Sequence, residues 1–178
     1  MTTREVLESF FDFRGKLNEF YSIIPSLYCL IERRKKVDEP FFIFLNKQID
    51  PMLISNEFHK VVQLTMHNIM HDCKGYDVDW TIMAYLFHSL DRINTAAKIH
   101  LNSIEYETFK TETTNFVCDQ LEDIYGSKLG ERQWAIFSLA ELTKTLKVKP
   151  EVTAGLKNVC NGFLIALSVY ILNKAFKK

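Results

Sequence analysis

Two histidines, His67 and His71, have the spacing in this sequence that most resembles that of metal ligands. They are four positions apart, so a helix places both rings on one face, with Asp72 beside them. A zinc-protease motif needs a glutamate where this chain has Asn68, and no cysteine or third histidine stands at ligand-like spacing. We therefore predict no metal site here and interpret both histidines as residues of a helix surface.

Nucleophilic catalysis requires a side chain that a neighbouring base and an orienting group activate. The chain has no Gly-x-Ser-x-Gly elbow, no glycine-rich phosphate loop and no paired acid motif. Carboxylates such as Glu122 and Asp123 have no sequence context that indicates a raised pKa. We therefore predict that the protein is not an enzyme and that it has no catalytic residues and no cofactor.

Composition narrows the class of protein further. The 178 residues contain 22 Lys plus Arg and 22 Asp plus Glu, so no excess charge favours nucleic acid as a partner. Six glycines and four prolines are too few for the many turns of a sandwich or barrel. The four cysteines form no Cys-x-x-Cys pair, and the N-terminus does not resemble a secretory signal. We expect a reduced, all-α protein with buried free thiols, in the cytoplasm or facing it.

Hydrophobic spacing indicates where the helices lie. Thr2-x-x-Glu5 and Asn102-x-x-Glu105 both have the form of a capping box at a helix start. Residues 80–93 have almost no polar side, which is typical of a helix buried all round. Further helices are predicted over residues 6–20, 26–36, 41–45, 55–72, 102–124 and 130–144, and after Pro150. The sequence predicts seven to eight helices around a buried central helix at about residues 80–93.

The last segment permits two interpretations. No charge stands between Lys157 and Lys174, and residues 159–172 are mostly apolar. A membrane span needs about 20 apolar residues, so this one is of marginal length for a C-terminal anchor. It is equally suited to a final packed helix. We predict a helical domain over residues 1–156 and an apolar tail over 157–178, with anchor and packed helix both open.

Three places in the chain resemble the B-cell lymphoma 2 (Bcl-2) family of apoptosis regulators. Residues 78–87, Val-Asp-Trp-Thr-Ile-Met-Ala-Tyr-Leu-Phe, resemble the first homology motif, usually Val-Asn-Trp-Gly-Arg before an apolar stretch. Residues 120–124 with 130–137, which include Trp134, resemble the second motif. The apolar tail with its lysine end is the third similarity. The resemblance covers about residues 55–178 and implies a Bcl-2-like bundle, with Trp80 and Trp134 as packing residues.

The resemblance also implies a hydrophobic groove for the helix of a partner protein. Such a helix places apolar anchors at positions i, i+3, i+4 and i+7 into the groove. By carry-over, the groove residues are Thr65, Ile69, Asp79, Thr81, Ile82 and Tyr85. Two of them depart from the family pattern, because the family's glycine is Thr81 here and its arginine is Ile82. That arginine pairs with an aspartate of the incoming BH-3 helix, so its loss shifts the pairing to another cation such as Arg92.

The function implied is that of a divergent Bcl-2-like survival protein, of a kind that viruses also encode for host-cell modulation. It would inhibit apoptosis by sequestering pro-death BH-3 proteins at the mitochondrial outer membrane or another cytosol-facing membrane. Two alternatives stay open. One is an immune-signalling decoy of the same architecture that binds host adaptor proteins through an outer helix face and forms a homodimer. The other is an unrelated helical enzyme with a lipid-like cavity.

Overall fold

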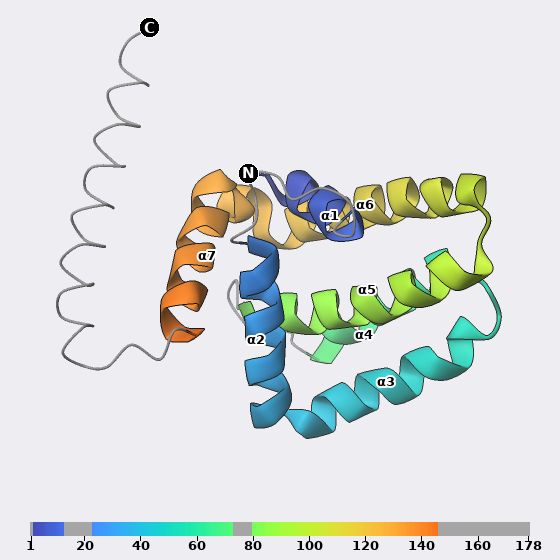
Figure 1. Ribbon diagram of the computed structural model, residues 1–178, viewed down its shortest axis with the longest axis horizontal. Coiled ribbons are helices and arrows are strands. Elements are labelled where there is room, and N and C mark those ends of the chain that lie inside the picture. Colours follow the sequence, from blue (N-terminus) through green and yellow to red (C-terminus); the bar gives the residue numbers. More distant parts are fainter. Residues whose placement is uncertain (1, 13–22, 73–79, 146–178) are drawn as a thin grey trace, which may run out of the picture. The chain divides into compact units, whose positions relative to one another are not determined.

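The computed structural model describes residues 2–12, 23–72 and 80–145, and in these ranges every secondary-structure element is a helix (Figure 1). Its elements are α1 (Thr3–Phe11), α2 (Ile23–Val37), α3 (Glu39–Leu53), α4 (Phe58–Asp72), α5 (Trp80–His100), α6 (Ser103–Tyr125), the short 3-10 helix η1 (Gly126–Leu129) and α7 (Glu131–Thr145). The prediction of an all-α bundle of about seven helices is confirmed. The chain divides into a compact unit, residues 1–142, and a second unit, residues 143–178.

Helix α5 is the centre of the first unit. Every residue from Thr81 to Leu90 is buried, because α2, α3, α4 and α6 all pack on it. Figure 1 shows α5 running beside α3 and in front of α4. The helix continues past the predicted end at residue 93 to His100, and over its last turns the buried positions narrow to Ile93, Asn94 and Ala97. A central helix with apolar residues on all sides is therefore enclosed by its neighbours, as its sequence indicates.

Both predicted capping boxes are present. The Thr2 hydroxyl accepts a bond from the Glu5 amide at 3.2 Å, and the Glu5 carboxylate accepts one from the Thr2 amide at 2.7 Å. Asn102 and Glu105 exchange the same pair of bonds, each at 3.0 Å, at the start of α6. Each box satisfies amides that have no partner in the first turn of a helix. Helix α6 ends at Gly126, whose φ of +56° is a backbone conformation that glycine adopts without strain.

Helix α3 differs from its prediction. The sequence predicts only a short helix over residues 41–45, bracketed by Pro40 and Pro51, whereas the helix spans Glu39–Leu53. Pro40 stands in the first turn, where a backbone N–H has no helical partner, so its missing donor costs nothing. Pro51 lies close to the end of the helix and removes one bond only. Phe42, Leu45 and Ile49 are buried, and packing of this face offsets the lost bond.

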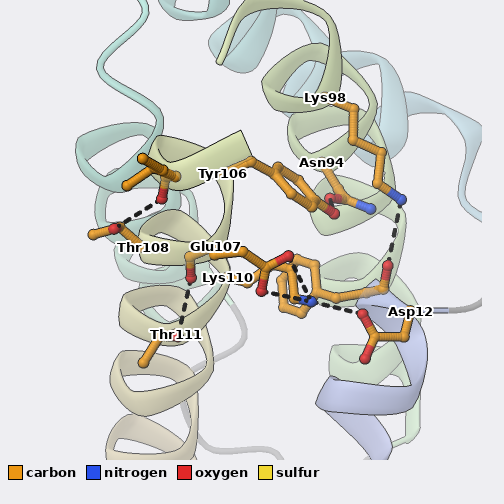
Figure 2. Close-up of polar contacts among 10 residues, drawn as sticks. Asp12, Asn94, Lys98, Tyr106, Glu107, Thr108, Lys110 and Thr111 are labelled. Carbon is orange, nitrogen blue, oxygen red and sulfur yellow. Dashed lines mark hydrogen bonds and ion pairs between the residues drawn. The ribbon is translucent and has the colours of Figure 1, made fainter. Parts of the chain in front are cut away.

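A polar network fastens α1 to α5 and α6 (Figure 2). The Lys110 ammonium group bonds to the Asp12 carboxylate at 2.6 Å and to Glu107 on its own helix. Lys98 donates to the carbonyl of Phe11 at 3.3 Å, at the last residue of α1. Tyr106 lies between these two lysines and donates to Asn94 at 2.8 Å. Several charge-assisted bonds therefore hold a helix of only nine residues in place.

Several predictions lie outside the described residues. They are the part of the first helix beyond Asp12, the groove residue Asp79, the helix after Pro150, and the apolar tail at 157–178, including the suggested anchor at 159–172. Of the described helices, none combines the length and the apolar character needed to cross a membrane. Helix α7, predicted over residues 130–144, spans Glu131–Thr145.

Candidate protein-interaction site

The predicted groove residues that the structure describes lie in the core. Thr65 and Ile69 are on α4, and Thr81, Ile82 and Tyr85 are on α5; Asp79 is outside the described residues. None of the five exposes more than 8% of its surface. A partner helix can therefore reach them only if the helices that cover them move. Other residues form the accessible surface around the start of α5.

The end of α2 and the start of α3 cover this part of α5. The Arg34 guanidinium donates a hydrogen bond to the Thr81 hydroxyl, and the Tyr85 hydroxyl donates one to the Asp38 carboxylate. The ring of Phe41 lies 4.4 Å from the ring of Tyr85, measured between centroids. Thr81 and Tyr85 are four residues apart and so lie on one face of α5. The α2–α3 corner of the chain is thus fixed on that face.

The outer side of this corner is apolar and aromatic. Phe41 and Phe44 stack with ring centroids 5.9 Å apart and an angle of 29° between the ring planes. Phe44 is 40% exposed and Val37, the last residue of α2, is 70% exposed. We call the set of Arg34, Val37, Phe41 and Phe44 the α2–α3 surface. It combines one cation with three apolar side chains that the core does not fully cover.

Arg34 is the cation on this surface that is free to bind a carboxylate. Its guanidinium donates to the neutral hydroxyl of Thr81, and none of the ion pairs among the described residues includes it. Its neighbours differ, because Arg33 pairs with Glu141 and Lys35 with Glu32. Arg92, which the sequence suggested as a substitute for the family's arginine, is bound to Asp50 of α3. The guanidinium at the start of α5 therefore comes from α2.

The two tryptophans lie against each other near the start of α5. Trp134 is completely buried, with its ring 5.3 Å from that of Trp80 in an edge-to-face arrangement. Phe137 stacks on Trp80 at 4.3 Å. The Trp134 indole N–H donates to the Thr3 hydroxyl at 3.2 Å, so the ring also fastens α7 to α1. These contacts are those of packing residues, and they anchor α7 beside the α5 N-terminus.

The titratable groups with shifted pKa values are spread through the fold. Burial lowers the pKa of His88 to about 4 and raises that of Tyr106 to about 12, and burial also raises the pKa of the Cys118 thiol. His88 contacts Asn46 at 3.0 Å, and Tyr106 belongs to the network of Figure 2. These two groups therefore sit in structural contacts between helices.

His67 and His71 on α4 are both exposed, with ring centroids 6.3 Å apart. His71 lies 3.3 Å from the carboxylate of the adjacent Asp72. Within the described ranges, no group of three or more His, Cys, Asp or Glu side chains is placed to hold a metal ion. Cys29 and Cys118 are free thiols and are half-buried, where the sequence suggested fully buried ones.

Sequence reasoning missed the residues of the α2–α3 surface. The basic run at residues 33–36 is typical of a solvated helix end, with contact to a membrane surface or an acidic partner as the alternative, and nothing in it distinguishes Arg34 from its neighbours. The sequence predicts a short helix over residues 41–45, which does not show which sides of Phe41 and Phe44 face the core. Their spacing of three residues places both rings on one side of the helix. That side is distinct from the positions of the buried Phe42, Leu45 and Ile49, and this spacing is the one signal that could have shown an incompletely buried aromatic pair.

Comparisons with known protein families, with characterised proteins and with solved structures find no match to this chain. The class defined by the fold is an all-α bundle built around an enclosed helix. The relation to the Bcl-2 family stays a prediction from the three motifs.

Proposed function

We propose that this protein binds an amphipathic helix of a partner protein and, without catalysis, acts as a Bcl-2-like survival factor that sequesters pro-death BH-3 helices. The observation that carries the proposal is the α2–α3 surface beside the start of α5. There a guanidinium without a carboxylate partner lies next to exposed and half-exposed apolar side chains. An amphipathic helix with one acidic residue among its apolar anchors has the complementary chemistry. The resemblance of residues 78–87 to the first homology motif supports the same location.

Arg34 is the proposed recognition residue for the partner's carboxylate. The family resemblance implies a cation at the position of Ile82, and Arg34 reaches the adjacent Thr81 from α2. Exchange of the neutral hydroxyl acceptor for a carboxylate pairs the guanidinium with an opposite charge, and such a pair can be bidentate. Arginine suits this role because its planar fork matches the two oxygens of a carboxylate.

Phe41, Phe44 and Val37 are the proposed apolar contacts. Phe44 and Val37 are largely accessible, and the stacked Phe41 ring is supported from below by Tyr85. A supported aromatic ring offers a large contact area at little cost in side-chain entropy. Ile69 and Ile82 lie under the surface, so burying a charge at either position would test folding rather than binding.

The test is a calorimetric titration of the full chain with a panel of synthetic BH-3 peptides. At least one peptide should bind with a dissociation constant of about 1 µM or less. Phe44→Glu should weaken that binding at least about tenfold, because it places a charge against the apolar anchors. Arg34→Gln should weaken it by about 10- to 100-fold, corresponding to one charge-assisted bond.

The matched control is Ile124→Glu, since Ile124 is 43% exposed on α6 and belongs to no part of the α2–α3 surface. It should leave binding unchanged, and circular dichroism should show the same helix content in all variants. Equal losses in Phe44→Glu and Ile124→Glu would place the binding surface elsewhere. No binding by any peptide would overturn the proposal and favour the alternative, a decoy that binds host adaptor proteins through an outer helix face.

A further inference from the structure

Apart from the α2–α3 surface, an apolar groove lies between α4 and α6, with a volume of about 640 Å³. We call it the α4–α6 groove. Its buried floor is formed by Phe58 of α4 and Phe109 of α6, whose rings meet edge to face at 6.1 Å. Asn56, from the α3–α4 connection, and Leu101, from the α5–α6 connection, both border it. Figure 1 shows these two connections at the same end of the bundle. The groove is therefore at the far end of α5 from the α2–α3 surface.

Ile104 is the most unusual residue of this groove. It lines the groove from the first turn of α6, yet it is 81% exposed. The preceding Asn102 caps the helix and holds this turn in a fixed position. A rigid turn presents this large aliphatic side chain to water. Its burial by a partner stabilises the complex by about 25 cal/mol for each Å² of apolar surface. Exposed apolar side chains that border a hollow are typical of binding sites.

The rim of the groove is acidic. It carries the three carboxylates of Glu57, Glu105 and Glu112 against one ammonium group, that of Lys60. Lys60 is already paired with Glu57 at 2.9 Å. The Glu112 carboxylate is exposed and lies 4.0 Å from the His59 ring nitrogen, which is a long distance for an ion pair. The rim is thus complementary to cations. A second copy placed on it about a two-fold axis would bring acidic rim against acidic rim, which is unfavourable.

The length of the groove fits a short helix. Its α6 side extends from residue 104 to residue 112, about 12 Å at 1.5 Å per residue. Apolar anchors at positions i, i+3, i+4 and i+7 of a partner helix span about 10 Å. Two turns of an amphipathic helix therefore match the length of the α6 side, from Ile104 to Glu112.

We propose that the α4–α6 groove binds a short amphipathic helix of a partner protein, with apolar anchors against Phe58, Phe109 and Ile104 and with lysine or arginine residues flanking the anchors. The site is separate from the α2–α3 surface, because Thr81 and Leu101 are about 30 Å apart along α5. It also selects the opposite charge, since its rim is acidic whereas Arg34 selects a carboxylate. The chain thus has two places for helices of different chemistry.

The test uses a pair of synthetic peptides of about 18 residues, or five helical turns. Both have an alanine-rich helix with leucines at i, i+3, i+4 and i+7, and they differ only in flanking lysines or flanking glutamates. Fluorescence anisotropy with the full chain should show the lysine peptide binding at least about tenfold more tightly. This preference should shrink at high salt, which screens the rim charges.

Two variants locate the site. Ile104→Asp should weaken binding of the lysine peptide at least about tenfold, whereas the matched control Ile99→Asp should not, because Ile99 is 73% exposed but does not line the groove. Glu112→Lys should reduce the ratio between the affinities for the lysine peptide and the glutamate peptide. Phe44→Glu should leave this binding unchanged, so failure of the α2–α3 surface as a BH-3 site and failure of this groove are distinguishable.

Three outcomes would overturn the inference. The first is equal affinity for the two peptides, or no detectable binding of the lysine peptide. The second is an equal effect of Ile104→Asp and Ile99→Asp. The third is a dimer, seen by sedimentation, that Ile104→Asp dissociates, since that result would assign the groove to a second copy of the chain.

Discussion

His88 makes the stability of this protein depend on pH. Its side chain is 7% exposed, is in contact with Phe42 at 4.9 Å between ring centroids, and bonds to Asn46 at 3.0 Å. All three residues belong to the contact between α3 and α5. Burial is the largest cause that lowers the pKa of His88, and the positive charges of Lys35 and Arg92 add to it. Glu32 raises the pKa by less, and the resulting pKa is about 4. The folded protein therefore holds this imidazole neutral.

The sign and size of the effect follow from the two pKa values. In the unfolded chain the imidazole has its ordinary pKa of about 6.5, so the unfolded state takes up the proton first as the pH falls. The contribution of the neutral His88 to the free energy of unfolding is fully present above pH 6.5. It is lost progressively as the pH falls to about 4, where the loss levels off. A pKa lowered to about 4 corresponds to about 3 kcal/mol. Relaxation of the surroundings and entry of water reduce the expected loss to about 2 kcal/mol.

The assay compares urea unfolding of the wild-type chain and of His88→Gln at pH 7 and pH 4.5. Glutamine keeps an amide that can bond to Asn46 but does not titrate. The wild type should lose about 2 kcal/mol more free energy of unfolding than the variant over this interval. Comparison with the variant removes the contribution of the carboxylates, which both proteins share. Equal losses in the two proteins would refute the reasoning, because His88 would then not be the group that takes up the proton. A difference of opposite sign would do the same.

Loss of this contact also affects the proposed binding surface. Helix α3 carries Phe41 and Phe44 on the outside and rests on His88 through Phe42 and Asn46. Protonation of the imidazole favours states in which α3 separates from α5. We therefore expect binding at the α2–α3 surface to weaken below about pH 5 in the wild type, and to weaken less in His88→Gln.

Three further predictions concern the packing that holds the sites in place. Trp134→Ala should lower the free energy of unfolding by about 3–5 kcal/mol in urea titrations, because a fully buried ring is lost, whereas Trp134→Phe should cost clearly less; equal costs would mean that the indole is not the packing element. Asn102→Ala should cost about 1 kcal/mol in thermal unfolding, because it removes the cap of α6, and an unchanged melting temperature would argue against the cap. Lys110→Met should cost about 1 kcal/mol or less at low ionic strength, with a smaller cost in 1 M salt, and a salt-independent cost would mean that the Asp12 and Glu107 pairs contribute little.

The sequence by itself determined the fold class and the central helix. Residues 80–90 have almost no polar side, so only enclosure by other helices keeps their apolar side chains from water. The capping boxes at Thr2 and Asn102 were equally readable, because each depends on two side chains three residues apart. Such features are local, and short-range spacing is enough to define them.

The tertiary structure alone decided which side chains face outward at the candidate sites. Arg34 meets Thr81 across 47 residues of sequence, and no spacing rule connects them. The groove residues predicted from the sequence have an apolar or small character, yet the packing of the helices buries all five that the structure describes: Thr65, Ile69, Thr81, Ile82 and Tyr85. Ile104 looks like an ordinary helix residue until α4 and α6 are brought together with an acidic rim around it. Exposure depends on how helices cross, and the periodicity of a single helix carries no information about its crossing partners.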